Sequence, residues 1–200
     1  MLSHSIANIV RYSSAFLPIV ILFILALPLC LLLLCLSWSI HVLEIAYPDH
    51  PHPSLPPSAN GQEAERGGRI FWTPISPGDR FILEQIHSVQ LCRVTDEFEI
   101  DRHYRMFLVS TTFSDHGAGL PYSSDRGETF SVQYDGRFKI SGMCRFAPEI
   151  LLRVGREHGN TFTFGVRLNL SEMCGDALLT VRTRKCTVFK CLLWKMLGSG

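Results

Sequence analysis

Residues 161–170 (TFTFGVRLNL) carry the clearest alternation of apolar and polar side chains in the sequence. Successive side chains of a β-strand point to opposite sides, so a strand with one buried face needs this period of two. The run therefore predicts one amphipathic strand. Its apolar face would consist of Phe162, Phe164, Val166, Leu168 and Leu170.

Shorter runs with the same alternation recur on both sides of this segment, and turn residues such as Asp135-Gly136 and Gly175-Asp176 separate them. Short strands at regular spacing indicate an antiparallel β-sandwich or jelly roll, which we place at residues 69–197. The expected strands cover residues 69–72, 80–86, 89–94, 104–113, 130–134, 138–146, 150–154, 161–170, 178–183 and 187–194.

The N-terminal region is far more apolar than the rest of the chain. Residues 16–40 (FLPIVILFILALPLCLLLLCLSWSI) are almost wholly apolar, and no formal charge lies between Arg11 and Glu44. About 20 apolar residues in a helix cross a bilayer core. We therefore expect an uncleaved transmembrane anchor (signal-anchor) over residues 14–43, behind a short cytoplasmic tail at 1–13. A cleaved signal peptide is the alternative, although its apolar core is usually shorter.

Residues 44–68 are rich in Pro, Gly, Ser and charge, which predicts an extended stalk. Arg11 before the apolar segment and acidic residues after it favour an N-terminus on the cytoplasmic side of the membrane. The sequon Asn169-Leu170-Ser171 makes Asn169 a candidate glycosylation site. The expected localisation is a single-pass type II membrane protein with its C-terminal domain extracellular or luminal, and the bilayer is its first expected partner.

Seven cysteines are many for a chain of 200 residues. Five of them follow the apolar segment, which in an oxidising compartment suggests two disulfides and one unpaired or intermolecular thiol. Cys186 and Cys191 are five positions apart. On a regular strand they would face opposite sides and could not pair without a bend.

We find no sequence signature of catalysis. The chain lacks G-x-S-x-G, a glycine-rich phosphate loop and H-E-x-x-H, and its cysteines lack C-x-x-C zinc spacing. Asp115 and His116 would suit acid–base chemistry, but a hydrated loop surface is the preferred interpretation. The net charge of +1 gives no reason to expect nucleic acid. We therefore expect a binding protein that is not an enzyme and has no cofactor or metal.

Three segments resemble the tumour necrosis factor ligand superfamily. Residues 166–181 (VRLNLSEMCGDALLTV) are similar to the late strands of that family, and residues 187–196 (TVFKCLLWKM) to its last strand. Residues 135–142 (DGRFKISG) resemble its D/E-G-x-Y-x-I-Y strand. The resemblance covers roughly residues 130–196.

This resemblance implies a membrane-anchored, cytokine-like ligand that binds and clusters a cell-surface receptor as a homotrimer of jelly rolls. The receptor-facing loop would contain Leu120, Pro121, Tyr122 and Arg126. Cys144 and Cys174, spaced on neighbouring strand regions, would be the first candidate disulfide. The aromatic residues divided between core and trimer contact would be Phe138, Phe162, Phe164, Phe189 and Trp194.

A second interpretation is an accessory or structural subunit of a larger membrane complex, including a viral envelope complex. Its β-domain would then pack on partner chains rather than capture a receptor.

Overall fold

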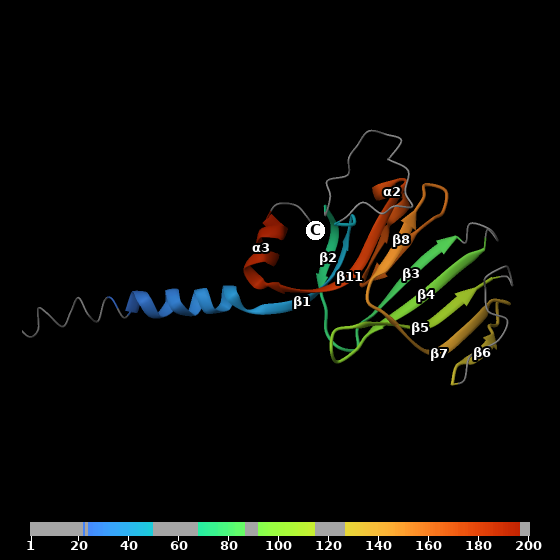
Figure 1. The fold of residues 1–200 in the computed structure, drawn as a ribbon, viewed down its shortest axis with the longest axis horizontal. Coiled ribbons are helices and arrows are strands. Elements are labelled where there is room, and N and C mark those ends of the chain that lie inside the picture. The colour runs from blue at the N-terminus through green and yellow to red at the C-terminus, as the bar shows by residue number, and fades with distance from the viewer. Residues whose placement is uncertain (1–21, 23, 50–67, 87–91, 115–126, 197–200) are drawn as a thin grey trace, which may run out of the picture.

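The computed structural model describes residues 22, 24–49, 68–86, 92–114 and 127–196 of the chain. Two antiparallel sheets make up most of this part, which confirms the predicted all-β sandwich (Figure 1). One sheet has four strands in the order β2-β1-β11-β8, and the other has seven in the order β10-β9-β3-β4-β5-β7-β6.

The strands of the two sheets come from different parts of the chain. The four-stranded sheet contains β1 (Ser39–Ala46), β2 (Arg69–Pro74), β8 (Ile150–Val154) and β11 (Ala177–Thr187). The seven-stranded sheet contains β3 (Arg80–Ile86), β4 (Arg93–Ile100), β5 (Met106–Phe113), β6 (Thr129–Val132), β7 (Phe138–Ala147), β9 (Thr161–Phe164) and β10 (Val166–Asn169). The described helices are one within residues 24–37, α2 (Leu170–Cys174) and α3 (Val188–Met196).

The main hydrophobic core lies between the two sheets. Leu43 and Ile45 of β1 and Leu179 of β11 face Phe81 of β3 and Phe162 of β9, and all five are fully buried. Burial of each such side chain stabilises the fold by roughly 1.5–3 kcal/mol. A second cluster, around Val94, Phe113 and Ile140, lies on the seven-stranded sheet alone.

β1 pairs along its whole length with β11, from Ser39 opposite Thr187 to Ala46 opposite Thr180. It lies in the segments predicted as anchor and stalk. Both of its faces are covered, because Leu43 and Ile45 face the core while Val42 lies in a cluster with Cys191 of α3. The apolar residues of β1 continue the apolar run of the helix before it, interrupted by His41 and Glu44.

Among the described residues, no helix is long and apolar enough to cross a membrane. The helix within residues 24–37 ends at Ser37, and the apolar residues after it enter β1. This contradicts the predicted localisation as a single-pass membrane protein with an extracellular or luminal C-terminal domain. Residues 14–21 and 23 of the predicted anchor lie outside the described part of the chain.

Two predicted strands are wrong in detail. The run at 161–170 folds back at Gly165, whose φ of +64° suits glycine, so that Phe164 lies opposite Val166 and β9 pairs with β10. Its last residue, Leu170, begins α2. The predicted strand at 187–194 is also wrong, because β11 ends at Thr187 and α3 follows directly.

Candidate protein-binding surface

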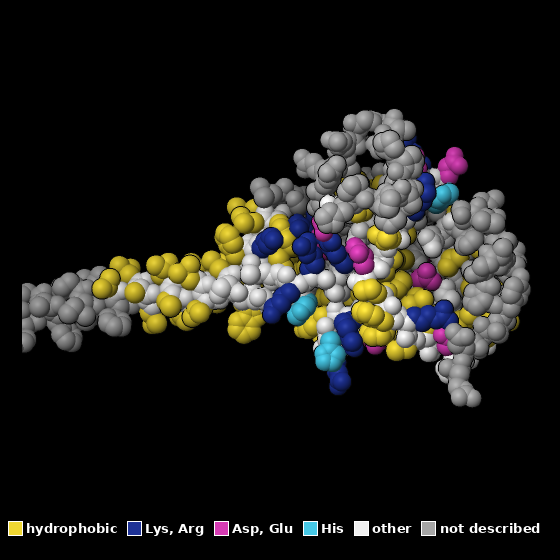
Figure 2. Space-filling model, in the orientation of Figure 1, with side chains coloured by type: hydrophobic (Ala, Val, Ile, Leu, Met, Phe, Trp, Pro, Cys, Tyr) yellow, Lys and Arg dark blue, Asp and Glu magenta, His cyan; other side chains and the backbone are white. Residues whose placement is uncertain are grey.

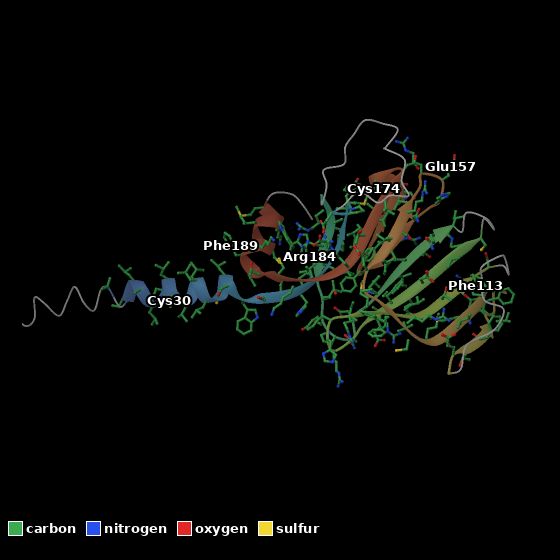
Figure 3. All side chains as sticks on the ribbon, viewed as in Figure 1. Cys30, Phe113, Glu157, Cys174, Arg184 and Phe189 are labelled. Atoms are coloured by element: carbon green, nitrogen blue, oxygen red, sulfur yellow. The ribbon has the colours of Figure 1, made fainter. Side chains whose placement is uncertain are left out.

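Helix α3 exposes a row of large apolar side chains. Phe189, Leu192, Leu193 and Met196 are 51%, 47%, 39% and 83% exposed. They occur at positions i, i+3, i+4 and i+7, so they share one face of the helix. We call these four residues the exposed stripe. In Figure 3, Phe189 lies at the end of the molecule from which the N-terminal helix extends.

The opposite face of α3 packs on the outside of the four-stranded sheet. Cys191 is buried in a cluster with Val42 and Cys186. The ring of Trp194 meets that of Trp72 edge-on, with 5.6 Å between centroids. Because α3 is thus apolar on two faces, packing against the sheet accounts for only one of them.

The ends of neighbouring elements fix the start of α3. The backbone N–H of Val188 donates to the carbonyl of Trp38 at 2.8 Å, and the Thr187 hydroxyl accepts from the N–H of Lys190 at 3.3 Å. A side-chain oxygen that accepts from an N–H three residues ahead is the contact made by an N-cap residue. This cap explains why the chain turns from strand to helix at Thr187.

A buried network of charges lies beside α3 on the same sheet. Glu44 is 1% exposed, and its carboxylate lies 3.3 Å from Arg182 Nη2 and 3.4 Å from Arg184 Nη1. Arg69 Nε lies 3.7 Å from Glu44 Oε2. Buried charges require such partners, because taking an unpaired ion out of water costs on the order of several kcal/mol.

This network also holds α3 in place. The guanidinium of Arg69 stacks over the ring of Trp194, 3.2 Å from its centroid. Arg182 Nη1 pairs with Asp49 Oδ2 at 2.7 Å, and this hydrogen bond, with the charge of Glu44, raises the pKa of Arg182 despite its burial. The position of the exposed stripe is therefore set by paired charges as well as by apolar contacts.

The helix within residues 24–37 adds further apolar surface near α3. Its leucines from Leu25 to Leu34 are 54–65% exposed, and Trp38 just after it is 71% exposed. Figure 2 shows apolar side chains gathered along this helix and over α3. Contiguous exposed apolar surface on a folded chain marks a site that another molecule covers.

The residues predicted for the site lie partly outside the described part of the chain. Leu120, Pro121, Tyr122 and Arg126 lie outside the described residues, as do Asp115 and His116. Phe162 is a core residue, whereas Phe138 and Phe164 are partly buried at the edges of the two core clusters. Of the aromatic residues considered for a subunit contact, only Phe189 belongs to the exposed stripe.

The candidate disulfide and glycosylation residues lie on the sandwich. Cys144 is exposed on β7 and Cys174 lies in α2, and both are free cysteines. The Cys174 thiol contacts the Tyr47 hydroxyl, and burial raises the pKa of each group. Asn169 caps α2, with its Oδ1 accepting from the Glu172 N–H at 3.3 Å.

The described part of the chain contains no group of three or more His, Cys, Asp or Glu residues able to hold a metal. A polar hollow of about 220 Å³ lies on the outer face of the seven-stranded sheet. Glu97 at its floor already accepts from Ser110 and Arg80. Its lining residues are Ile82, Thr95, Glu97, Ser110, Thr112, Gln133, Arg137 and Lys139.

The exposed stripe was not predicted, although the helical spacing of its apolar residues is visible in the sequence. The segment VFKCLLWKM fits both a strand of period two and a helix with apolar residues at 189, 192, 193 and 196. Short apolar runs cannot be assigned to helix or strand by periodicity alone. In the separate strand predicted at 187–194, Phe189 and Leu193 would lie on one face and Leu192 on the other, so these residues would not form a row.

The fold defines this protein as an antiparallel two-sheet sandwich with an apolar C-terminal helix on its outside. A family described as a domain of unknown function, DUF1850, matches residues 81–170. This match covers β4 to β10 and nearly all of β3, and so almost the entire seven-stranded sheet. No curated protein and no solved structure matches the chain significantly.

The match contradicts the resemblance to the tumour necrosis factor ligand superfamily, because the matching family is unrelated to it. The structure shows why the motifs misled. Residues 187–196, taken as a final strand, are mainly helix α3, and residues 166–181 include helix α2. Alternating apolar residues occur in any sandwich, so they do not identify a particular family.

Proposed function

We propose that this protein is a non-enzymatic accessory subunit that binds a partner protein through the exposed stripe of α3. The partner contributes an amphipathic helix whose apolar side chains pack between Phe189, Leu192, Leu193 and Met196. The observation that carries this proposal is the second apolar face of α3, which no described part of the chain covers. Helix-in-groove recognition commonly uses anchors at i, i+3, i+4 and i+7.

The charges of α3 restrict the chemistry of the partner. The helix contains Lys190 and Lys195 and no acidic residue. Because like charges across an interface are unfavourable and opposite charges steer association, we expect acidic residues beside the apolar anchors of the partner helix. The exposed leucines of residues 24–37 lie next to this site and would extend the contact.

The rest of the domain serves this function as a rigid support. α3 rests on a sheet whose β1 and β11 pair over eight residues, and on the Glu44 network below Trp194. Binding sites on rigid elements keep their anchors in place, so less conformational entropy is lost on association. This interpretation keeps the sequence-based expectation of a binding protein and the alternative of a subunit that packs on partner chains.

Site-specific photocrosslinking tests the proposal. A benzophenone amino acid replaces Leu192 in the full-length protein, which is irradiated in its own cells, purified and analysed by mass spectrometry. The matched control carries the same group at Tyr134, a fully exposed residue between β6 and β7. We expect one protein partner to be crosslinked from position 192 and not from position 134, and the crosslink to be lost when Leu193→Glu is added.

Three outcomes would contradict the proposal. Equal crosslinking from both positions would show non-specific contact. Crosslinking only to another copy of the chain would show that the stripe mediates self-association, including a homotrimer. Adducts with phospholipid alone would show that the stripe contacts lipid rather than protein.

A further inference from the structure

Two cysteines meet where β11 turns into α3. Cys186 is near the end of the strand and Cys191 is in the second turn of the helix, and they are 6% and 5% exposed. Their thiols are hydrogen-bonded to each other within the cluster that also contains Val42. The sharp change from strand to helix supplies the bend that a straight strand lacks.

We propose that Cys186 and Cys191 are a disulfide-forming pair that covalently ties α3 to β11. Contact between the two thiols is the geometric condition that distinguishes this pair from the other cysteines. The Cys174 thiol contacts Tyr47, and Cys144 is exposed on the seven-stranded sheet. Cys92 is buried in the separate cluster around Phe113.

The reaction is thiol–disulfide exchange with a small disulfide such as glutathione disulfide. One cysteine thiolate attacks a sulfur of the small disulfide, which forms a mixed disulfide and releases one small thiolate. The second cysteine thiolate then attacks the sulfur of the protein in this mixed disulfide and releases the second small thiolate. The two cysteines are oxidised, the small disulfide is reduced to two thiols, and the two cysteine protons pass to them.

The surroundings of the pair set its reactivity. Burial, together with the hydrogen bond and charge of Cys186, raises the pKa of Cys191 to about 11, while the charge of Arg69 opposes this shift. The thiolate is the attacking species, so exchange in the folded protein is slow at neutral pH and faster at mildly alkaline pH. The pair therefore suits a stable tie between helix and strand rather than a fast redox switch.

This tie would hold the exposed stripe in one position relative to the sheet. The residues enclosed between the two cysteines include Thr187, Phe189 and Lys190, so the crosslink would fix the first turn of the helix. The proposed disulfide rests on the contact between Cys186 and Cys191 beneath α3. It does not depend on whether the exposed stripe binds a partner.

Peptide mapping of the full-length wild-type protein tests the proposal directly. The protein is equilibrated with glutathione disulfide at mildly alkaline pH, alkylated without reduction and digested with trypsin. Because Lys185, Lys190 and Lys195 flank the cysteines, they fall in separate peptides, 186–190 (CTVFK) and 191–195 (CLLWK). We expect these two peptides to be joined and the protein to remain monomeric on a non-reducing gel.

Two variants control the experiment. Cys144→Ser removes a cysteine outside the pair and is expected to leave the joined peptides unchanged. Cys191→Ser is expected to leave Cys186 either alkylated or as a mixed disulfide with glutathione, with peptide 186–190 joined to no other peptide. Recovery of the two wild-type peptides unjoined after oxidation, whether alkylated or carrying glutathione, would overturn the proposal, as would joining of either peptide to one that contains another cysteine.

Discussion

The two sheets of this protein are assembled in different ways. In the seven-stranded sheet, β3, β4 and β5 pair in sequence order, β6 pairs with β7, and β9 with β10, so most neighbours are close in the chain. The four-stranded sheet instead pairs β1 with β11, strands from residues 39–46 and 177–187. The family match covers nearly all of the first sheet but only β8 of the second.

The outer faces of the two sheets differ as well. On the seven-stranded sheet, Glu97 and Glu99 are 25% and 36% exposed and share Arg80. On the four-stranded sheet, Glu44 is 1% exposed among three arginines beneath α3. The segments outside the family match thus supply three of the four strands of the second sheet, β1, β2 and β11, and the covered, charged face on which α3 packs. The surface proposed to bind a partner therefore lies outside the residues that match the family.

The largest expected effect comes from breaking the contact between the sheets. Phe162 of β9 packs against Phe71 of β2, with 5.5 Å between ring centroids, and against Phe81 of β3 at 5.6 Å. Phe162→Ala should lower the free energy of unfolding by about 4 kcal/mol, through lost burial and a cavity. Urea denaturation measures this loss. Phe189→Ala, at a site 51% exposed, is the control and should change stability by less than about 0.5 kcal/mol.

The second prediction compares the two outer faces directly. Glu44→Gln keeps the side-chain shape but removes the negative charge that faces three arginines. We expect a loss of about 3 kcal/mol, because removing one partner leaves buried charges uncompensated. Glu99→Gln removes an exposed partner of Arg80 and should cost less than about 1 kcal/mol. Equal losses in the two variants, measured by chemical denaturation, would show that burial does not distinguish the faces.

The third prediction concerns the loop that carries the chain from one sheet to the other. This loop, between β8 and β9, is held by Ser171 of α2, whose hydroxyl donates to the Gly155 carbonyl and accepts from the Asn160 N–H, both at 2.8 Å. Ser171→Ala leaves both backbone groups without this partner and should lower stability by about 2 kcal/mol. The exposed Ser76→Ala is the control. The midpoint of thermal unfolding is measured for both variants, and equal shifts in Ser171→Ala and Ser76→Ala would refute the prediction.

The smallest effects should appear as opposite pH dependences of two aspartates, Asp96 within β4 and Asp101 directly after it. Burial raises the pKa of Asp96, against the opposing hydrogen bond from Thr111. The folded state then favours the neutral acid, so stability falls as the pH rises from the unfolded pKa through the folded one. Asp96→Asn should therefore stabilise the protein at pH 7 relative to wild type and give no such gain at pH 3.

Asp101 should behave in the opposite sense. Desolvation alone would raise the pKa of its carboxyl, but hydrogen bonds from the Arg105 guanidinium and from the N–H groups of Arg105 and His103 lower it to about 2. Its contribution to stability is present above the unfolded pKa near 4 and is lost as the pH falls through about 2. Asp101→Asn should thus destabilise the protein at neutral pH. Unfolding curves across the acidic range would show whether the effects of Asp96→Asn and Asp101→Asn on the free energy of unfolding change with pH in opposite directions.

Strands whose identity depends on local alternation were predicted closely from sequence. The expected strands at 80–86 and 150–154 coincide with β3 and β8, and the one at 138–146 matches β7 to within one residue. In contrast, residues 93–100 form β4 where the sequence predicted a strand at 89–94. In β4, Val94, Asp96 and Phe98 point inward and the side chains between them point outward. The acidic Asp96 on the inner face interrupts the alternation of apolar and polar residues.

The sandwich class can be predicted from local sequence, because a period of two specifies a half-buried strand wherever it occurs. The pairing of the strands follows from contacts made in the folded protein. β1 reads as part of a longer apolar run until β11 pairs with it, and Glu44 meets Arg182 from 138 positions away. Thr187 ends a strand and begins a helix in a segment that fits both, which brings Cys186 to Cys191 and exposes the apolar stripe. These features depend on contacts between residues that are far apart in the sequence, so local sequence patterns do not predict them.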